Sequence, residues 1–314
     1  MADTVAVAGG TGGLGRAIVD AIVASGDFEV LILSRTTDES RSQTSKSGSR
    51  IVSVDYNDLD NIKQVLEENN VTTVISTLNL QLDITPELNL IKAAENSKTT
   101  RRFIPSIWVA KYIPQETDTI HLAKTKKDIY PTLEATSLEY SAWYVGLFLD
   151  YWVMPHAPSY MRPFPYAIDI ENRRAALPGQ GNVPIVFNYT LDIAKFVTAS
   201  LKLPHWDKET YVINDKLTFN EFLQAAEDAT DAKFDVTYDP IELPQSGKTN
   251  ALPPTLPEGY SALKDLLEGY MASVGVMIEN GEFDFKPSRT INETFPDIKV
   301  RRVNEFLKEV WGKK

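Results

Sequence analysis

A glycine-rich loop near the start of the chain constrains the fold more than any other sequence feature. Residues 9–15 read Gly-Gly-Thr-Gly-Gly-Leu-Gly and lie between an apolar run at 5–8 and an amphipathic, helix-like stretch. In a dinucleotide-binding turn, Gly9 permits the tight bend, Gly12 lets a pyrophosphate approach the backbone, and Gly15 lets the helix pack on the strand. We therefore predict a pyrophosphate site at this helix N-terminus. A loop without a ligand is the alternative interpretation.

The first half of the chain alternates short apolar runs with amphipathic stretches, which is typical of strand–helix units around a buried parallel sheet. Further strands are predicted at 28–33, 51–54, 71–77, 102–105 and 140–145. The predicted fold class is α/β, a doubly wound parallel sheet (Rossmann fold) with a smaller C-terminal substrate-binding domain. We assign 1–154 to the dinucleotide-binding domain, with 185–214 returning to it, and 155–314 to the substrate-binding region, where prolines and aromatic residues crowd together.

Local signals predict where several helices begin. Asp58 and Thr85 are predicted N-caps, and Thr218 with Glu221 forms a capping-box pattern. A helix is also expected over 119–136, with a bend at Pro131 because proline lacks a backbone N–H.

The residues after the second predicted strand indicate which dinucleotide binds. An NAD site usually places a carboxylate there for the ribose 2′-OH, whereas this chain reads Ser34-Arg35-Thr36. A guanidinium pairs with a 2′-phosphate and the hydroxyls add hydrogen bonds, so the expected cofactor is NADP(H). A solvated surface arginine is the alternative.

Further cofactor contacts are expected at the carboxyl ends of the strands, where ligands bind in open parallel sheets. Asp55 would meet adenine there, or else cap its own loop. The other predicted cofactor-binding residues are Thr11, Gly13, Leu14, Thr77, Leu78, Asn79, Pro105, Ser106, Tyr144, Gly146 and Phe148.

Motifs spread over nearly the whole chain point to one family. Besides the loop and Arg35, they are Arg102–Ser106, Leu133–Ala135, Leu147–Tyr151, Asp169–Asn172, Asp192–Phe196 and Phe295–Ile298. Together they resemble the NmrA-like proteins, atypical short-chain dehydrogenases that stand with the isoflavone, pinoresinol-lariciresinol and phenylcoumaran benzylic ether reductases. The likeness is greatest to the fungal isoflavone-reductase-like branch.

The resemblance implies an NADPH domain, hydride delivery to a conjugated or benzylic carbon, and a lysine as general acid or base. That lysine falls on Lys126, with Lys124 and Lys127 as neighbouring alternatives; Lys126 could instead bind the nicotinamide ribose. The chain departs from the reductases at 106–109, where they usually read Ser-Glu-Phe-Gly or Ser-Glu-Trp-Gly. Ile107 removes that carboxylate, which bears on the substrate pose and not on the cofactor site.

The residues alone, apart from the family resemblance, indicate a candidate acid–base lysine that has no tyrosine four residues before it. Most short-chain dehydrogenases place a tyrosine four residues before a lysine, and the only such spacing here, Tyr260 to Lys264, lies far from the nucleotide domain. A lone lysine must lose solvation to act near neutral pH. Apolar rings that could line such a substrate pocket, or equally fill the core, are Trp108, Tyr112, Phe148, Trp152, His156 and Tyr160.

Composition excludes several classes of function. The chain has no cysteine and only three histidines at unrelated spacings, so disulfides, Cys chemistry and a protein-held metal are not expected. A net charge of −11 disfavours nucleic-acid partners. Without a membrane span or secretory signal in the sequence, we expect a cytoplasmic protein. The oligomeric state is left open, a homodimer included.

Three functional hypotheses follow. The leading one is an NADPH-dependent reductase of a small aromatic or conjugated molecule, of the kind made in secondary metabolism, with Lys126 as proton donor. A second keeps the same pocket and cofactor for a redox-neutral isomerisation or cyclisation. A third is a non-catalytic NADP-sensing regulator like NmrA itself, which would not need Lys126.

Overall fold

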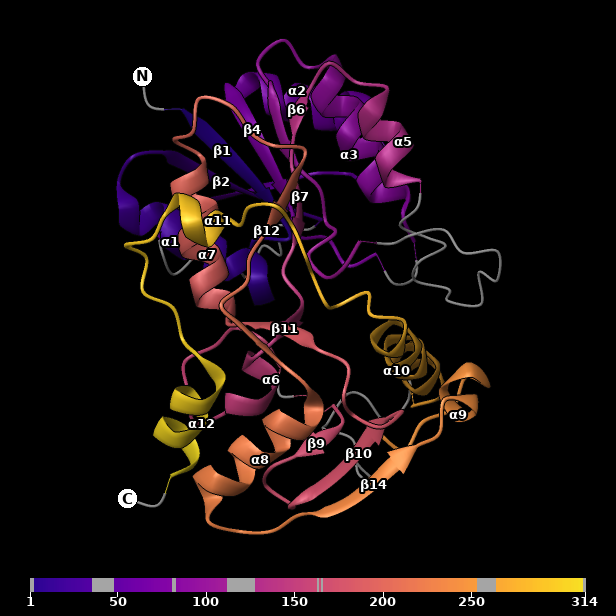
Figure 1. The fold of residues 1–314 in the computed structure, drawn as a ribbon. Coiled ribbons are helices and arrows are strands. Elements are labelled where there is room, and N and C mark those ends of the chain that lie inside the picture. Colours follow the sequence, from indigo (N-terminus) through magenta and orange to yellow (C-terminus); the bar gives the residue numbers. More distant parts are fainter. Residues whose placement is uncertain are drawn as a thin grey trace. The chain divides into compact units, whose positions relative to one another are not determined.

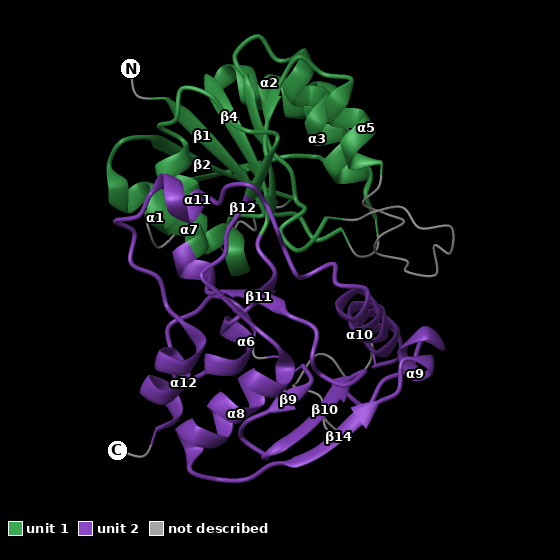
Figure 2. Cartoon of the chain, viewed as in Figure 1, with its two compact units in different colours: residues 1–118, 122–144, 193–210 green, residues 119–121, 145–192, 211–314 purple. Residues whose placement is uncertain are grey.

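A computed structural model of the chain describes residues 3–35, 48–80, 83–111, 128–162, 164, 166–252 and 264–312 (Figure 1). Residues 1–118, 122–144 and 193–210 form one compact unit, unit 1 (Figure 2). Residues 119–121, 145–192 and 211–314 form the other, unit 2. The main division falls after Tyr144, earlier than the predicted boundary at 154, and the returning segment is 193–210 within the predicted 185–214.

Unit 1 contains a six-stranded sheet in the order β3-β2-β1-β4-β5-β6, with every adjacent pair parallel. Its strands are β1 (Thr4–Ala8), β2 (Glu29–Ser34), β3 (Arg50–Ser53), β4 (Val71–Ser76), β5 (Arg102–Ile104) and β6 (Glu139–Tyr140). From β1 the chain adds β2 and β3 on one side of the sheet, and it then adds β4, β5 and β6 on the other side. This change of direction between β1 and β4 confirms the predicted doubly wound α/β fold. All five residues of β1 are buried, as expected for the central strand of a parallel sheet.

Helices cover both faces of this sheet. α2 (Leu59–Glu68), α3 (Thr85–Asn96) and α5 (Ile129–Glu134) lie on one face, and α1 (Gly13–Ser25) and α7 (Thr190–Ser200) on the other (Figure 1). Asp58 caps α2 by accepting hydrogen bonds from the Asp60 and Asn61 N–H groups, as predicted. Thr85 is the first residue of α3 and Ile84 is its N-cap, so the predicted cap at Thr85 is wrong, while Pro86 lies in the first turn as expected.

The predicted strand at 140–145 is two short strands. β6 pairs with β5, and β7 (Ala142–Tyr144) pairs instead with β12 (Glu209–Tyr211). Ser141 between them still donates its N–H to the Phe103 carbonyl at 3.1 Å, so the chain continues in the direction of β6 past the end of β5. Pro131 lies in the first turn of α5, where its missing N–H has no helical partner to lose; residues 112–127 of the predicted helix are outside the described part.

Unit 2 is built from short strands and longer helices. One sheet has the order β14-β10-β9 and another β13-β11-β8. Its elements are β8 (Leu147–Phe148), α6 (Asp150–Val153), β9 (Ile168–Asp169), β10 (Arg174–Pro178), β11 (Ile185–Asn188), β13 (Asp215–Leu217), α8 (Phe219–Thr230), β14 (Asp235–Asp239), α9 (Glu242–Gln245), α10 (Lys264–Glu279), α11 (Ile291–Thr294) and α12 (Val303–Trp311). The Thr218–Glu221 capping box opens α8 as predicted.

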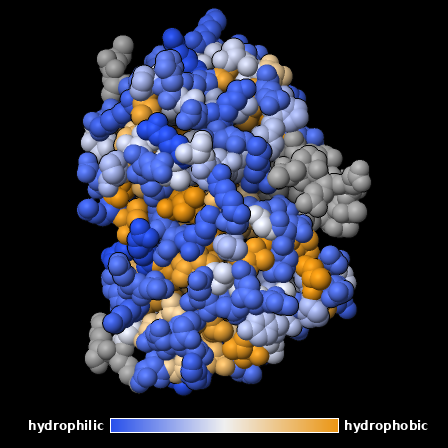
Figure 3. Space-filling model, viewed as in Figure 1, coloured by the Kyte–Doolittle hydropathy of each residue, from blue (hydrophilic) through white to orange (hydrophobic). Residues whose placement is uncertain are grey.

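Rings from three elements form the core of unit 2. Trp152 lies 5.6 Å from Phe187 and 5.0 Å from Phe222 between ring centroids. The outer surface is mostly hydrophilic on the face in Figure 3, where apolar side chains are interrupted by polar ones. Within the described residues, the large apolar side chains that reach half exposure are Tyr238 and Leu266.

Candidate functional site

The glycine loop is pressed against the end of β4. Gly9 has a φ of +78°, in the left-handed region, and a Cβ there would lie 2.8 Å from the Thr77 carbonyl oxygen. A Cβ on Gly15 would lie 2.3 Å from Thr77 Oγ1 and 2.5 Å from the Gly9 carbonyl oxygen. Thr77 is itself fixed, because its hydroxyl donates to the Ala8 carbonyl at 2.8 Å. These two glycines are therefore required by the protein's own packing.

Gly12 differs from its neighbours in the loop, because a Cβ there would meet nothing within 4 Å. It is the N-cap residue of α1; among the described residues no side chain caps this helix, and its first turn carries no acidic residue. The N-terminus of a helix presents free N–H groups and a positive dipole end. The cradle thus fits a pyrophosphate, and Gly12 is the place where added bulk would meet a ligand before it met protein.

Arg35 follows β2 directly and is exposed. Its guanidinium is near Tyr56: the pKa of the Tyr56 hydroxyl is raised by burial and by Glu87, and Arg35 acts against that rise. The Tyr56 hydroxyl donates to the Leu33 carbonyl at 3.3 Å. An exposed arginine at the end of β2 suits a phosphate on the adenosine half of a dinucleotide.

The neighbouring predicted contacts are arranged less uniformly. Ser34 is the last residue of β2, whereas Thr36 lies outside the described residues. Asp55 is exposed, and its carboxylate accepts a hydrogen bond from the Asn57 N–H at 2.9 Å, which is the geometry of a loop cap.

A buried carboxylate joins the carboxyl ends of β4 and β5. Glu87, in the first turn of α3, is fully buried and accepts hydrogen bonds from the Ser76 hydroxyl and, at 2.9 Å, from the Ser106 N–H. The Ser106 hydroxyl donates to the Leu78 carbonyl at 2.8 Å. The sequence analysis predicts the loss of a carboxylate at Ile107 and does not identify Glu87 as a site residue. A carboxylate is present at this edge, supplied by another element.

Trp108 extends the same network. Its φ of +43° is in the left-handed region, and its indole N–H donates to the Ser76 carbonyl at 2.7 Å. Its ring lies 6.0 Å from that of Trp143 on β7. Trp108 is 5% exposed, so it forms the wall that supports this edge and offers a ligand little surface. Of the remaining predicted contacts, Pro105 follows β5 directly and Asn79 lies in the segment after β4.

Tyr144, a predicted cofactor contact, is fully buried at the end of β7. Its hydroxyl lies 3.0 Å from the hydroxyl of Tyr130 on α5. Tyr130 was not predicted. A sequence signal for it exists, since it follows Lys126 by four residues, the usual tyrosine–lysine spacing in reverse order. Lys126, Lys124, Lys127 and Tyr112 all lie outside the described residues.

The remaining predicted residues belong to unit 2. Gly146 has a φ of +66°, and a Cβ there would lie 2.1 Å from the Val186 carbonyl oxygen. Trp152 is 2% exposed and belongs to the aromatic core, with its indole N–H on the Tyr166 carbonyl at 3.2 Å. The His156 ring stacks edge-on against Trp311 at 4.4 Å. Phe148 and Tyr160 are half-buried, which leaves ring surface for a ligand.

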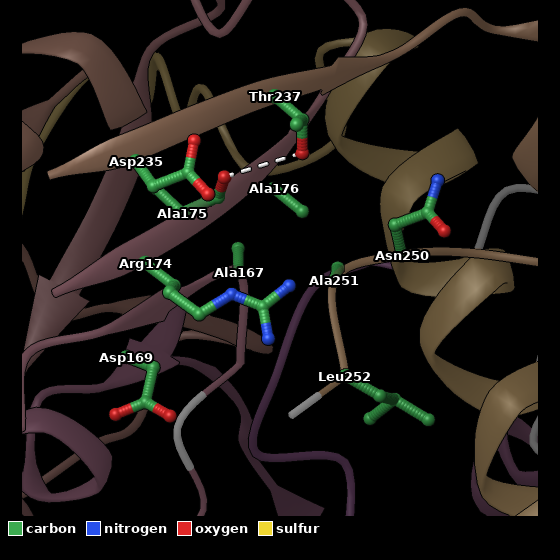
Figure 4. A pocket seen from close by; sticks show the side chains of 10 residues that line it. All are labelled: Ala167, Asp169, Arg174, Ala175, Ala176, Asp235, Thr237, Asn250, Ala251 and Leu252. Carbon is green, nitrogen blue, oxygen red and sulfur yellow. Dashed lines mark hydrogen bonds between the residues drawn. The ribbon is translucent and has the colours of Figure 1, made fainter. Parts of the chain in front are cut away.

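A separate cavity of about 260 Å³ lies over the β14-β10-β9 sheet in unit 2 (Figure 4). The Arg174 side chain reaches across it toward Ala251 and Leu252, and Asp169 and Asp235 flank the arginine. The acidic pair offsets the guanidinium charge, so this cavity is a poor anion site. No residue predicted for cofactor or substrate lines it.

The described part of the chain contains neither a metal-binding cluster nor a membrane-spanning helix. No group of three or more histidine, aspartate or glutamate side chains there could hold a metal ion. No helix there combines the length and apolar character needed to cross a bilayer.

An open parallel sheet with a glycine cradle at the first strand–helix turn defines the class of dinucleotide-binding Rossmann proteins. Within that class, the chain belongs to the NmrA-like family, whose model matches residues 1–307. The predicted family membership is thereby confirmed.

Similar proteins are named oxidoreductases. Oxidoreductase BOA1 of Botryotinia fuckeliana is 34% identical over 299 residues, covering 94% of this chain and 95% of that protein. Oxidoreductase swnN of Metarhizium robertsii is 31% identical and covers 98% and 97%. Phenylcoumaran benzylic ether reductase PT1 of Pinus taeda is 24% identical over 95% and 96%.

Solved structures share the fold. AtPrR2 with NADP⁺ and (+)pinoresinol superposes with a TM-score of 0.73 at 22% identity, over 99% of both chains. The leucoanthocyanidin reductase–NADPH complex from Vitis vinifera gives a TM-score of 0.75 at 18% identity, over 98% of both chains.

Proposed function

We propose that this protein is an NADPH-dependent oxidoreductase that reduces a small aromatic or conjugated substrate. The observation that carries the proposal is the cradle at the start of α1 together with Arg35 at the end of β2, where an NAD enzyme would have a carboxylate. Relatives at 31% and 34% identity bear the name oxidoreductase, which supports the same conclusion.

The residues of unit 1 divide the work of holding the dinucleotide. The backbone at Gly9, Gly12 and Gly15 would accept the pyrophosphate against the helix N-terminus, and Arg35 would pair with the 2′-phosphate. When bound, NADPH supplies the hydride. Glu87 would keep the loop at Ser106 in place beside it, since its carboxylate accepts the Ser106 N–H.

The substrate class and the acid–base group are part of the proposal. Relatives include a phenylcoumaran benzylic ether reductase, and a neighbouring structure contains (+)pinoresinol, both of which point to aromatic substrates. Lys126 is the proposed general acid or base, on the strength of the family motif around it.

Calorimetric titration with NADPH and NADH tests the cofactor assignment. The wild type should prefer NADPH, and Arg35→Ala should weaken NADPH binding by about 10- to 100-fold while leaving NADH unchanged, because a charge-assisted phosphate contact is lost. Arg101→Ala, an exposed arginine just before β5, is the matched control and should bind as the wild type does. Equal affinity of the wild type for both dinucleotides would overturn the assignment.

Stopped-flow loss of nicotinamide absorbance against a panel of aromatic enones and benzylic ethers tests the reaction. Lys126→Ala should lower turnover by about 100-fold or more, with Lys124→Ala and Lys127→Ala as controls that keep it. Product formation without net NADPH loss would establish a redox-neutral reaction instead. Inertness toward the whole panel would contradict the reductase.

A further inference from the structure

Two tyrosine hydroxyls meet in unit 1, one on a fully buried residue and one on a half-buried residue. Tyr144, the last residue of β7, is fully buried, and Tyr130, on α5, is half-buried. Their oxygens are 3.0 Å apart, a hydrogen bond in which either can be the donor. Of the two residues, only Tyr130 keeps exposed surface that a ligand could contact.

The pair lies at the edge of the sheet where the dinucleotide is proposed to bind. Ser141 continues the parallel pairing of β6 with β5, so Tyr144 extends beyond the carboxyl end of β5. The residue before it, Trp143, contacts Trp108, whose indole N–H is fixed on the Ser76 carbonyl at the end of β4. The end of β7 is thus tied to the ends of two strands at the ligand-binding edge.

The Tyr144 hydroxyl makes it easier for Tyr130 to give up its proton. A tyrosine is a weak acid, with an ordinary pKa of about 10, and a hydroxyl that donates to its phenolate makes that form easier to reach. The described charged groups of α5 and α3, which pack together, are exposed or bonded to other residues. Lys92, Asp128 and Glu134 are exposed, Glu95 accepts hydrogen bonds from Ser137, and Glu87 accepts them from Ser76 and Ser106.

We propose that Tyr130 is the catalytic proton donor to a substrate oxygen and that Tyr144 is the positioning residue behind it. The proposal rests on the reductase function above. It gives the proton donation to Tyr130 and leaves Lys126 the other role named above, binding of the nicotinamide ribose. It also narrows the substrate to a conjugated carbonyl compound. The substrate gains a hydride at carbon, its C=C π electrons shift to the carbonyl oxygen, and that oxygen takes the Tyr130 proton. Tyr144 donates its hydrogen bond to the resulting phenolate, which regains a proton from water after product release.

Phenylalanine variants remove each hydroxyl and keep the ring. Tyr130→Phe should lower kcat for an aromatic enone by about 100-fold and Tyr144→Phe by about 10-fold, with KM nearly unchanged in both. Tyr140→Phe is the matched control. Tyr140 is the last residue of β6 and takes no part in the hydrogen bond between Tyr130 and Tyr144, so this variant should keep the wild-type kcat. NADPH affinity, measured by calorimetry, should stay within about twofold in all three variants, since the phosphates are proposed to bind at the glycine loop and Arg35.

Ionisation of Tyr130 provides a readout besides turnover. In protein labelled at tyrosine ¹³Cζ and saturated with NADP⁺, Tyr130→Phe identifies the resonance of that residue. Its ionisation constant should be about tenfold smaller in Tyr144→Phe than in the wild type, because the donor to the phenolate is gone. The same constant in both proteins, or full kcat in Tyr130→Phe, would overturn the proposal. Loss of NADPH binding by the wild type would instead overturn the reductase function itself.

Discussion

Units 1 and 2 are stabilised in different ways. In unit 1, strands of up to six residues pair in one parallel sheet, and glycines allow close contacts at its edge. In unit 2 the sheets have three strands each, and buried polar side chains connect segments far apart in the sequence, as Glu87 does at one edge of unit 1. Asn188 and Asp150, both fully buried, are the main examples. Repeated backbone pairing produces a periodic sequence pattern, whereas a single buried polar contact produces none.

The largest effect that would test this difference is expected at Asn188. Its side-chain amide donates to the Val145 and Val212 carbonyls at 2.6 and 2.8 Å, and its carbonyl accepts the Asn214 N–H at 2.9 Å. Asn188→Ala leaves these buried groups without partners and should reduce the free energy of unfolding by about 4 kcal/mol.

Urea unfolding followed by circular dichroism measures this change. Asn220→Ala is the control in unit 2, since the Asn220 hydrogen bonds to Gln180 and Asn182 are at the surface and should contribute about 1 kcal/mol or less. If the two variants were equally stable, buried polar contacts would not be what holds unit 2 together.

Within unit 1, two loop glycines should separate folding from binding. Gly15→Ala forces a Cβ against Thr77 and the Gly9 backbone and should cost about 1–3 kcal/mol of stability. Gly12→Ala meets no protein atom within 4 Å, so its unfolding should match the wild type while its NADPH affinity falls. Thermal unfolding and calorimetry on both variants measure the two effects. Unchanged NADPH binding in Gly12→Ala would contradict the cradle.

A smaller effect, of opposite sign to the usual one for a carboxylate, is expected at Asp150. Burial raises the pKa of Asp150, although hydrogen bonds from Ser159 and Thr190 act against the rise. The folded protein therefore holds this proton more tightly than the unfolded chain does. The associated stability is present below the unfolded pKa of about 3.9 and is lost as pH rises through the higher folded value.

Comparison with Asp150→Asn isolates this contribution. From pH 4 upward the wild type should lose stability relative to the variant, by at most about 1.4 kcal/mol per pH unit, until Asp150 is ionised. Unfolding curves of both proteins across that range provide the measurement. Parallel pH profiles for the two proteins would show that Asp150 has an ordinary pKa in the folded state.

Much of unit 1 could be predicted from the sequence. The strand–helix alternation reports which faces are buried, and it led to the parallel sheet, the glycine loop and the Asp58 cap. The break between β6 and β7 at Ser141 could not be predicted, because it depends on the pairing of β7 with β12, which lies far along the chain. Periodicity predicts where helices and strands lie in the sequence, but it does not predict which distant strands pair.

The same limit explains the missed site residues. Glu87 reads as an ordinary first-turn acid of α3, and only the fold brings Ser106 to its carboxylate. Tyr130 reads as a helix residue next to a proline, and only the end of β7 brings Tyr144 to its hydroxyl. Conversely, Trp152 looks like pocket lining in the sequence and packs in the aromatic core of unit 2.

The indole pair at the sheet edge has an optical consequence. Trp108 and Trp143 lie 6.0 Å apart at the edge of the sheet where the dinucleotide is proposed to bind, and both are almost fully shielded from water. Indole emission overlaps the absorption band of reduced nicotinamide but not that of the oxidised form. Bound NADPH should therefore quench the fluorescence emission of these rings, whereas bound NADP⁺ should leave it unchanged. The native chain would then report the redox state of its own ligand without a dye.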